Sequence, residues 1–495
     1  MREEEPNTSE PPAVSAEELV LRSRNLLGEL EDLECFLASK NRRESELGSV
    51  ELRQFKNSII AESNSLQKSL RQLTGADLTS EKTVHTLRSS NLPFYEAVWA
   101  AAKRSTGLIA FNKRFYWDET ADDIKAINTR ISDRTPVKTR RRNVLVDIVT
   151  RGGLEWVKVS TITETRLLFD MAKAGWENGE DSDDVEPSVA GSGDELSLVK
   201  LARELSRAAQ ATRIHYRHPQ IRFVLPKVAL GIIPAIDSLI ANIQATGAQV
   251  ECGPSPTANC GTPAPALKDI AENLLVDPFA DFSPTLNIDC TILLALVSDL
   301  SHGAVAPEPR FHHAIMRQIE LEKQEKLLPD LLFPAMGARE LVCTREAHRR
   351  MREIVELIGT RTEKGRTALL MGDDPGKPRD VLVREFRELS DHHVPEHWNL
   401  PVKVVESDVD ARKTLPATAK IVAENLSEIN RSVFLFGWAS GQTTISSNRT
   451  VAKLIENLVE EHRKGDDEMG PSIWLCPTAR SLVGKEKNRR SWGKG

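Results

Sequence analysis

The sequence predicts an α/β protein, with an N-terminal helical hairpin and small α/β domain followed by a C-terminal three-layer α/β/α domain with a mainly parallel sheet. Strand-like runs alternate with amphipathic helical segments along most of the chain. A segment rich in Pro, Gly and Thr, residues 253–265, separates two such regions, and a length of 495 residues suits two or three domains. We therefore expect disorder over 1–14, one domain over 15–255, a linker over 256–279 and a second domain over 280–485.

The composition is that of a globular protein, with 40% hydrophobic and 28% charged residues. A net charge of -6 argues against a chain that binds nucleic acid with its whole surface, so any basic surface has to be local. No apolar run of about 18 residues is present, which predicts no membrane partner. Six cysteines without a CxxC pair suit a reducing compartment, and the acidic start lacks the features of a signal peptide. The expected location is the cytoplasm or the nucleus rather than outside the cell.

Two helices are predicted near the N-terminus. Ser15 and Glu18 have the spacing of a capping box, which predicts a helix start, and the leucines at helical spacing after it are Leu19, Leu26, Leu30 and Leu33. The second helix has a clearer apolar stripe, formed by Leu52, Phe55, Ile59, Leu66, Leu70 and Leu73. The short charged link 41–48 predicts an antiparallel hairpin with this stripe packed internally. Docking of a protein partner on these helices is the alternative.

A β-hairpin is predicted next, because the runs 143–150 and 154–161 are rich in β-forming residues and flank a Gly-Gly turn. The basic residues 138–142 before it suggest a solvated loop, with a localisation signal or a phosphate contact as the alternative. An acidic segment rich in Ser and Gly, residues 177–195, predicts a disordered loop. The rest of this domain follows a β-α-β rhythm, with helices over 196–211 and 234–246 and strands over 221–225 and 249–251.

The hairpin carries two acids and a lysine, Asp147, Glu155 and Lys158. This set is similar to the acid-and-lysine pattern of restriction-like nucleases. In that pattern an acid stands two residues before the lysine, where this chain has Trp156. A nuclease site in the hairpin is therefore the weaker interpretation.

Strands and helices alternate again in the C-terminal half. The predicted strands are Thr285–Ile288, Arg339–Thr344, Val402–Glu406, Ser432–Phe436, Thr443–Ser447 and Ser472–Cys476. The predicted helices are Cys290–Leu300, Gln318–Leu332, Arg345–Gly359, Pro416–Leu426 and Val451–Glu461. This alternation predicts a parallel sheet with helices on both faces.

The strongest candidate for chemistry is Asp289, which ends a buried strand and opens a helix. Ligands of parallel α/β sheets bind at the carboxyl ends of the strands, so this is a useful place for a metal-binding acid. The alternative is that Asp289 only caps the helix, as Asp often does.

Asp289 with Thr291 and the helix after them resembles the first motif of PIN-like domains. The chain as a whole resembles an uncharacterised eukaryotic family that joins an N-terminal domain of unknown function to a PIN-like C-terminal domain. The segments that carry this resemblance are Val146–Lys158, Asn287–Gly303, Glu340–Cys343 and Thr444–Asn448. Active PIN domains are metal-dependent ribonucleases, in which several carboxylates hold Mg²⁺ or Mn²⁺.

The resemblance implies four acidic positions, of which this chain fills the first with Asp289. The second lies in the helix after the next strand, where Glu346 and Glu353 flank the expected place. The third and fourth follow later strands, where the chain offers Ser440 and Asn448. We therefore expect an impaired catalytic site, with Asp289 retained as a helix cap. An active endoribonuclease using Asp289 with Glu346 or Glu353, and a purely structural scaffold, are the alternatives.

The same resemblance makes single-stranded RNA the expected ligand. Basic residues on and after the helix at 345–359 are the candidate contacts, with Arg349, Arg350, Lys364 and Arg366 as the first choices. Several glutamates interleave with these bases, so a solvated helix face is the alternative reading.

Overall fold

The computed structural model describes residues 12–41, 50–74, 85, 87, 89–119, 140–173, 196–253, 265–309, 311–407 and 415–484. These residues form two compact units, which we call the N-terminal unit (up to Asp277) and the C-terminal unit (from Pro278). Each unit has its own five-stranded sheet and its own helices, so the predicted α/β class is confirmed. The predicted link 41–48, apart from Asn41, and the acidic segment 177–195 lie outside the described residues.

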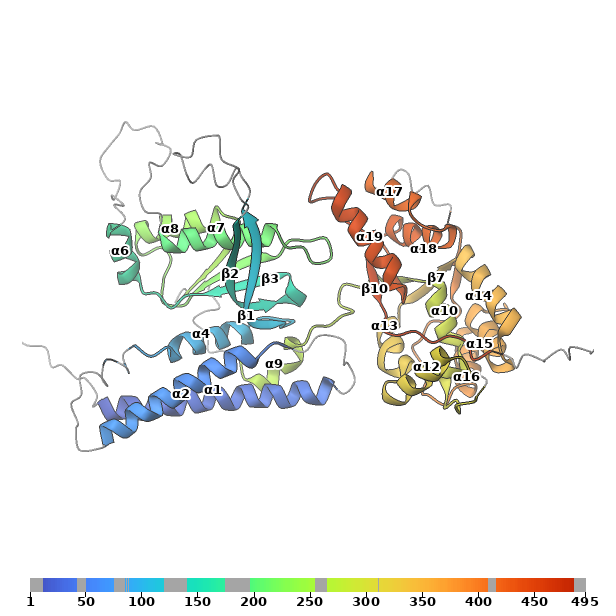
Figure 1. Ribbon diagram of the computed structural model, residues 1–495, viewed down its shortest axis with the longest axis horizontal. Helices are drawn as coiled ribbons and strands as arrows, with labels where there is room; N and C mark the ends of the chain where they lie inside the picture. Colours follow the sequence, from blue (N-terminus) through green and yellow to red (C-terminus); the bar gives the residue numbers. More distant parts are fainter. Residues whose placement is uncertain are drawn as a thin grey trace, which may run out of the picture. The chain divides into compact units, whose positions relative to one another are not determined.

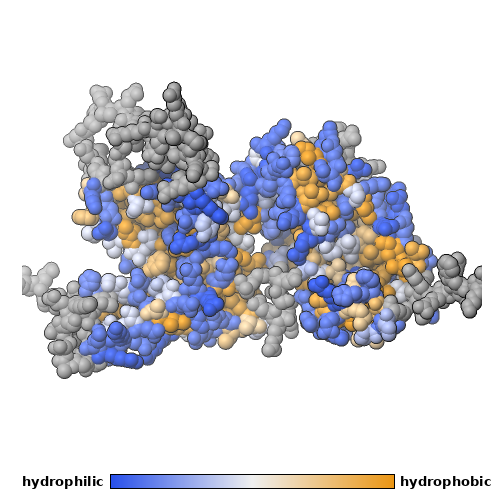
Figure 2. Space-filling model, in the orientation of Figure 1, coloured by the Kyte–Doolittle hydropathy of each residue, from blue (hydrophilic) through white to orange (hydrophobic). Residues whose placement is uncertain are grey.

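The N-terminal unit opens with two helices that pack side by side, α1 (Pro12–Asn41) and α2 (Arg53–Thr74) (Figure 1). The first helix begins at Pro12, inside the stretch 1–14 that was expected to be disordered. The apolar stripes of both helices, apart from Leu73, whose side chain lies outside the described residues, are buried or partly buried in one cluster with α4 (Leu92–Lys103) and one face of the sheet. Over α1 and α2 the visible surface is mainly hydrophilic (Figure 2). The stripe is therefore used for internal packing, as predicted.

The sheet of this unit has the order β1-β2-β3-β4-β5. Its strands are β1 (Ala110–Glu119), β2 (Arg140–Thr150), β3 (Glu155–Val159), β4 (Gln220–Leu225) and β5 (Gln249–Cys252). The first three strands are antiparallel and the last two run parallel to β3. The predicted β2–β3 hairpin is confirmed, and its turn needs residues at positive φ, including Gly152 at 65° and Gly153 at 102°.

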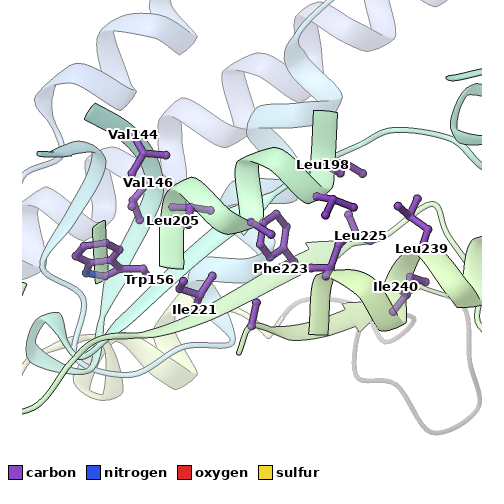
Figure 3. Packing of buried hydrophobic residues seen from close by; sticks show 14 of the residues in the cluster. Val144, Val146, Trp156, Leu198, Leu205, Ile221, Phe223, Leu225, Leu239 and Ile240 are labelled. Carbon is purple, nitrogen blue, oxygen red and sulfur yellow. The ribbon is translucent and has the colours of Figure 1, made fainter. Parts of the chain in front are cut away.

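The other face of this sheet is covered by α7 (Ser197–Gln210) and α8 (Pro234–Gln244), with α6 (Glu164–Lys173) beside α8. Figure 3 shows the cluster that results, in which Trp156 and Phe223 from the sheet meet Leu205 and Leu239 from the helices. Because side chains alternate along a strand, Trp156 enters this cluster while Val157 enters the cluster on the α1 and α2 side. The sheet is thus buried on both faces at its central strand β3.

The N-terminal unit continues past the predicted boundary near residue 255. Helix α9 (Leu267–Leu274) lies in the expected linker, yet Leu274 is buried in the cluster of α1 and α2. Two backbone hydrogen bonds attach it, from Gly107 N–H to Asn273 O and from Leu108 N–H to Leu274 O, at 2.9 and 2.8 Å. These bonds make α9 part of the N-terminal unit, which ends at Asp277.

The C-terminal unit is built on an all-parallel sheet with the order β10-β9-β6-β7-β8. Its strands are β6 (Thr285–Ile288), β7 (Glu340–Thr344), β8 (Lys403–Val405), β9 (Thr443–Ser446) and β10 (Ile473–Leu475). The helices between β6 and β8 are α10 (Cys290–Val297), α11 (Asp299–His302), α12 (His313–Gln324), a π-helical segment (Leu327–Leu332), α13 (Phe333–Met336), α14 (Arg345–Ile358), α15 (Arg361–Met371) and α16 (Arg379–Glu388). The helices after β8 are α17 (Thr418–Glu424), α18 (Glu428–Ala439) and α19 (Arg449–His462).

Three predicted elements of this unit are corrected. The expected helix Cys290–Leu300 ends at Val297, and α11 begins at Asp299 after the extended residue Ser298. The segment Ser432–Phe436, expected as a strand, lies inside α18, because a short apolar run does not by itself distinguish a buried strand from a buried helix. The expected single helix Gln318–Leu332 is divided into α12 and the π-helical segment. No helix among the described residues is long and apolar enough to cross a bilayer.

Candidate functional site

The strand order of the C-terminal unit defines where a ligand site belongs. From β6 the chain moves outward to β7 and β8, then returns to the other side of β6 to form β9 and β10. In open parallel sheets this reversal leaves a crevice at the carboxyl ends of the two central strands, and ligands bind there. In this unit those strands are β6 and β9.

Asp289 and Ser446 lie at this reversal point, directly after β6 and at the last residue of β9. Oδ2 of Asp289 accepts two hydrogen bonds, from the hydroxyls of Thr291 and Ser446, each at 2.7 Å. The backbone N–H of Asp289 donates to Ile445 O at 3.0 Å, which continues the β6–β9 ladder by one residue. The aspartate is thus fixed at the point that the sequence predicted.

Asp289 is deeply buried, with 3% of its surface exposed. Burial raises the pKa of its carboxyl group, while the hydroxyls of Ser446 and Thr291 and the backbone N–H groups at the start of α10 lower it; the net pKa is above the usual value. No basic side chain among the described residues forms an ion pair with it. The donors that it has among the described residues are all neutral groups.

The capping role expected for Asp289 is present only in part. Asp289 occupies the N-cap position of α10, and the backbone N–H groups of Cys290 and Thr291 act on its carboxylate, but the side chain makes no regular capping hydrogen bond. Its shortest contacts are those with the two hydroxyls. Asn448 is the residue that caps, since its Oδ1 accepts from Val451 N–H at 3.2 Å at the start of α19.

The polar contacts extend from Asp289 into the loop after β9. Thr291 Oγ1 accepts from Ser447 N–H at 3.3 Å, and Ser446 Oγ accepts from Asn448 N–H at 3.0 Å. Side-chain and backbone groups of this loop are therefore tied to the start of α10. We call this set, Asp289, Thr291, Ser446, Ser447 and Asn448, the reversal-point cluster.

A second set of buried contacts joins β6 and β9, the two strands that carry the cluster, to α18. Asn287 in β6 donates from Nδ2 to Val433 O at 2.9 Å and to Thr444 Oγ1 at 3.0 Å, which attaches α18 to β6 and β9. A Cβ atom added at Gly437 would lie 2.2 Å from Thr444 Oγ1, so only glycine allows α18 this close. Sequence reasoning missed these residues because single Asn and Thr residues inside strands have no characteristic spacing.

The two glutamates expected beside Asp289 have other partners. Glu346 lies in the first turn of α14 and accepts a hydrogen bond from Ser432 at 2.5 Å. Burial raises the pKa of Glu346, but the Ser432 hydroxyl and the charge of Arg349 help to lower it, and the net pKa is below the usual value. Glu353 lies about 12 Å along the helix axis from the start of α14. It forms an ion pair with Arg350 at 3.4 Å, and both side chains are exposed.

Ser440 is separated from the cluster by the course of the chain. It is the C-cap residue of α18, three residues before β9 begins. The amino ends of parallel strands lie at the edge opposite their carboxyl ends. Ser440 therefore does not face the reversal point, and the expectation that it does followed from reading α18 as a strand.

The donor set at the reversal point does not fit a divalent metal ion. Mg²⁺ and Mn²⁺ prefer several hard oxygen ligands, usually including more than one carboxylate. The cluster supplies one carboxylate, and the described parts of the chain hold no group of three or more His, Cys, Asp or Glu residues that could bind a metal. We derive no reaction step through a metal at this site.

Of the four candidate RNA contacts, Arg349 and Arg350 are exposed, whereas Lys364 and Arg366 bind other groups of the same unit. Arg349 and Arg350 are exposed on α14, and the charge of Arg350 acts on the thiol of Cys290, beside Asp289. Lys364 forms an ion pair with Glu356. Arg366 is only 5% exposed and donates to Val297 O, Leu389 O and the carboxylate of Asp299, so its guanidinium is occupied inside the unit.

The hairpin acids of the N-terminal unit are also satisfied internally. Asp147 accepts from Lys158 Nζ and from Val159 N–H, both at 2.8 Å, and Glu155 pairs with Arg222 at 3.3 Å. Trp156, at the position of the missing acid, is fully buried in the core. This arrangement gives no support to a nuclease site in the hairpin.

Comparison with known proteins adds one finding about the C-terminal unit. No solved structure matches the chain. Residues 286–376, which run from β6 past the end of α15 and include Asp289 and Glu346, match the family described as "Protein of unknown function (DUF1308)".

Proposed function

We propose that the C-terminal unit is a divergent PIN-like domain that binds single-stranded RNA at the carboxyl edge of its sheet and does not cleave it. The observation that carries the proposal is Asp289, a single carboxylate held by neutral hydroxyls at the reversal point, with exposed arginines on the neighbouring helices. The PIN-like assignment rests on the resemblance of the sequence and on the strand order β10-β9-β6-β7-β8.

The binding half of the proposal is supported by charge at this edge. α14 and α19 both begin at the carboxyl ends of strands, so the positive ends of their dipoles point to the same edge. Arg349 and Arg350 on α14 and Arg449 at the first position of α19 are exposed there. Phosphate groups are the natural partners of such a surface, and binding through them weakens as salt rises.

The lack of cleavage is supported by the donor set. Metal-assisted phosphoryl transfer needs acids that hold the ions against their hydration shells. One carboxylate with a raised pKa and two hydroxyls do this poorly. The alternative, an active endoribonuclease that recruits Glu346, requires that glutamate to leave Ser432.

The test uses the purified full chain with fluorescein-labelled oligouridine at low salt, followed by fluorescence anisotropy. The double variant Arg349→Glu/Arg449→Glu is expected to weaken binding by at least about tenfold, because each reversal removes one phosphate contact and adds a repulsion. The matched control is Arg317→Glu/Arg384→Glu, which changes the same charge on α12 and α16. No binding by the wild-type chain, or equal loss in the control, refutes the binding half.

A gel assay with Mn²⁺ tests the other half. Intact RNA is expected after long incubation with the wild-type chain. Cleavage that Asp289→Asn abolishes would overturn the proposal in favour of the active endoribonuclease.

The proposal also concerns the cell. The five described cysteines form no disulfide, in keeping with a reducing compartment, and we place the protein in the cytoplasm or nucleus.

A further inference from the structure

The two long strands β1 and β2 form a ribbon whose two faces differ. Nine residue pairs are in antiparallel register, from Ala110 with Val149 to Glu119 with Arg140. On one face Phe115 stacks on Trp156 at 3.8 Å between ring centroids, and Trp117 is buried in the same cluster under α7. This face is part of the core.

The opposite face of the ribbon is polar, basic and open. Its register brings Tyr116 opposite Asn143, with Arg114 and Arg141 as neighbours on the same face. Tyr116 is 49% exposed, which is unusual for a large aromatic residue in a strand, and Arg114, Arg141 and Asn143 are exposed as well. We call these four residues the ribbon face.

The contacts within the ribbon face leave its charges available. The guanidinium of Arg141 lies over the ring of Tyr116 at 4.6 Å, and Arg114 donates to Oδ1 of Asn143 at 2.9 Å. Neither arginine forms an ion pair with another described residue; Asp118, opposite Arg141 in register, is the nearest carboxylate along the strand. Flat cationic groups and an exposed ring therefore stand side by side, and among the described residues neither arginine is tied up in an ion pair.

We propose that the ribbon face binds a single-stranded nucleic acid. An unpaired base stacks on Tyr116 in the place of the Arg141 guanidinium, which is itself a flat group at stacking distance and moves to a neighbouring phosphate. Arg114, oriented by Asn143, contacts the next phosphate along the strand. An exposed aromatic ring beside exposed arginines on a sheet is an arrangement that binds unpaired bases with little sequence preference.

This proposal is independent of the proposed function. It concerns other residues, on the other unit, and it names a shared chemistry of unpaired bases and phosphates that RNA and DNA both offer. The test therefore uses two probes, labelled oligouridine and labelled oligothymidine, each titrated with the full chain at low salt.

The key variants are Tyr116→Ala and its conservative partner Tyr116→Phe. Loss of the ring is expected to weaken binding roughly 5- to 150-fold, the range found for single stacked bases, whereas Phe keeps the stacking surface and most of the affinity. The double reversal Arg114→Glu/Arg141→Glu is expected to weaken binding and to flatten its dependence on salt. Circular dichroism melting checks that the variants remain folded.

A matched control and the separate site variants keep the outcomes distinct. Arg53→Glu/Lys68→Glu makes the same charge change on exposed positions of α2 and is expected to leave binding unchanged. Wild-type affinity in Tyr116→Ala, an equal loss in the α2 control, or no binding of either probe overturns the ribbon proposal. Loss in the ribbon variants with no loss in Arg349→Glu/Arg449→Glu supports the ribbon and refutes the C-terminal proposal, and the reverse pattern does the opposite.

Discussion

Each unit buries one aspartate within its sheet region, and the two are held in different ways. Asp147 of the N-terminal unit contacts the ammonium group of Lys158 and a backbone N–H, whereas Asp289 of the C-terminal unit contacts two hydroxyls. Burial raises the pKa of both carboxyl groups, and only Asp147 has a neighbouring cation that lowers it again. The charge of Asp147 is balanced by Lys158 within the fold. Asp289 has no balancing charge among the described residues.

The comparison makes its strongest prediction for Lys158. Lys158→Met leaves the carboxylate of Asp147 buried without its cation, and we expect the N-terminal unit to lose about 3–5 kcal/mol of unfolding free energy. Urea denaturation followed by tryptophan fluorescence measures the loss. Lys113→Met is the control, since its ion pair with Glu51 is more exposed and is expected to contribute at most about 1 kcal/mol. A loss below 1 kcal/mol in Lys158→Met would mean that Asp147 does not depend on this lysine.

The support beneath Asp289 gives the next largest effect. Gly437→Ala forces a methyl group against Thr444 Oγ1, and we expect α18 to shift at a cost of about 1–3 kcal/mol. Gly28→Ala, in the interior of α1 where an added Cβ meets no atom within 4 Å, is expected to stabilise its unit by about 0.5–1 kcal/mol. Thermal unfolding of both variants checks the opposite signs. Equal effects would show that the close packing of α18 is not needed.

A smaller effect is expected for the hydroxyls that face Asp289. Ser446→Ala removes one hydrogen bond to the buried carboxylate and one acceptor for Asn448 N–H, at a cost of about 1–2 kcal/mol. Thr291→Val keeps the shape of the side chain and removes the other bond to Oδ2. Denaturation of the single and double variants measures whether the two bonds act together. A double variant as stable as the wild type would leave Asp289 without a role in stability.

The parts of this site that sequence reasoning predicted are those that follow from chain order. Strand-helix alternation predicts a parallel sheet, and a parallel sheet places the residue after a central strand at the carboxyl edge, so Asp289 was located correctly. Ser446 could not be found in this way, because a hydroxyl in the run Thr443–Ser446 becomes significant only when the strand pairs with β6. Pairing is a tertiary property.

The errors have a common physical origin. The run Ser432–Phe436 is apolar enough for a buried strand, and only its packing against β6, β7 and β9 shows that it is a helix. That error moved Ser440 to the wrong edge of the sheet. Arg366 was read as a surface base because its neighbours in sequence are charged, but a carboxylate and two carbonyl groups bury it. Long-range partners decided each case.

The smallest change in unfolding free energy is expected for Asp289→Asn, and this variant also gives the sharpest test of the proposed function. Asp289→Asn keeps an oxygen that accepts from Ser446 and Thr291, so we expect it to change the unfolding free energy by less than about 1 kcal/mol near neutral pH. The sign of its pH dependence follows from the raised pKa. Between the unfolded pKa near 3.8 and the higher folded pKa, the folded wild-type chain binds more protons than the unfolded chain, so its stability falls as pH rises through that window.

The asparagine variant lacks this titration, and its stability relative to the wild type is therefore expected to rise from about pH 4 to about pH 7. Unfolding of both proteins at the two pH values, at equal ionic strength, measures the difference. The opposite slope, with the wild type gaining on the variant as pH rises, would mean that the ionised carboxylate is stabilised in the folded state. Such a result would mean that the hydrogen-bond donors of Asp289, or a cation beside it, outweigh the effect of burial, and a cation would favour the metal-dependent endoribonuclease over a binding module. Repeating the measurement with a chelator would then show whether that cation is a metal ion, because removing it would restore the slope expected here.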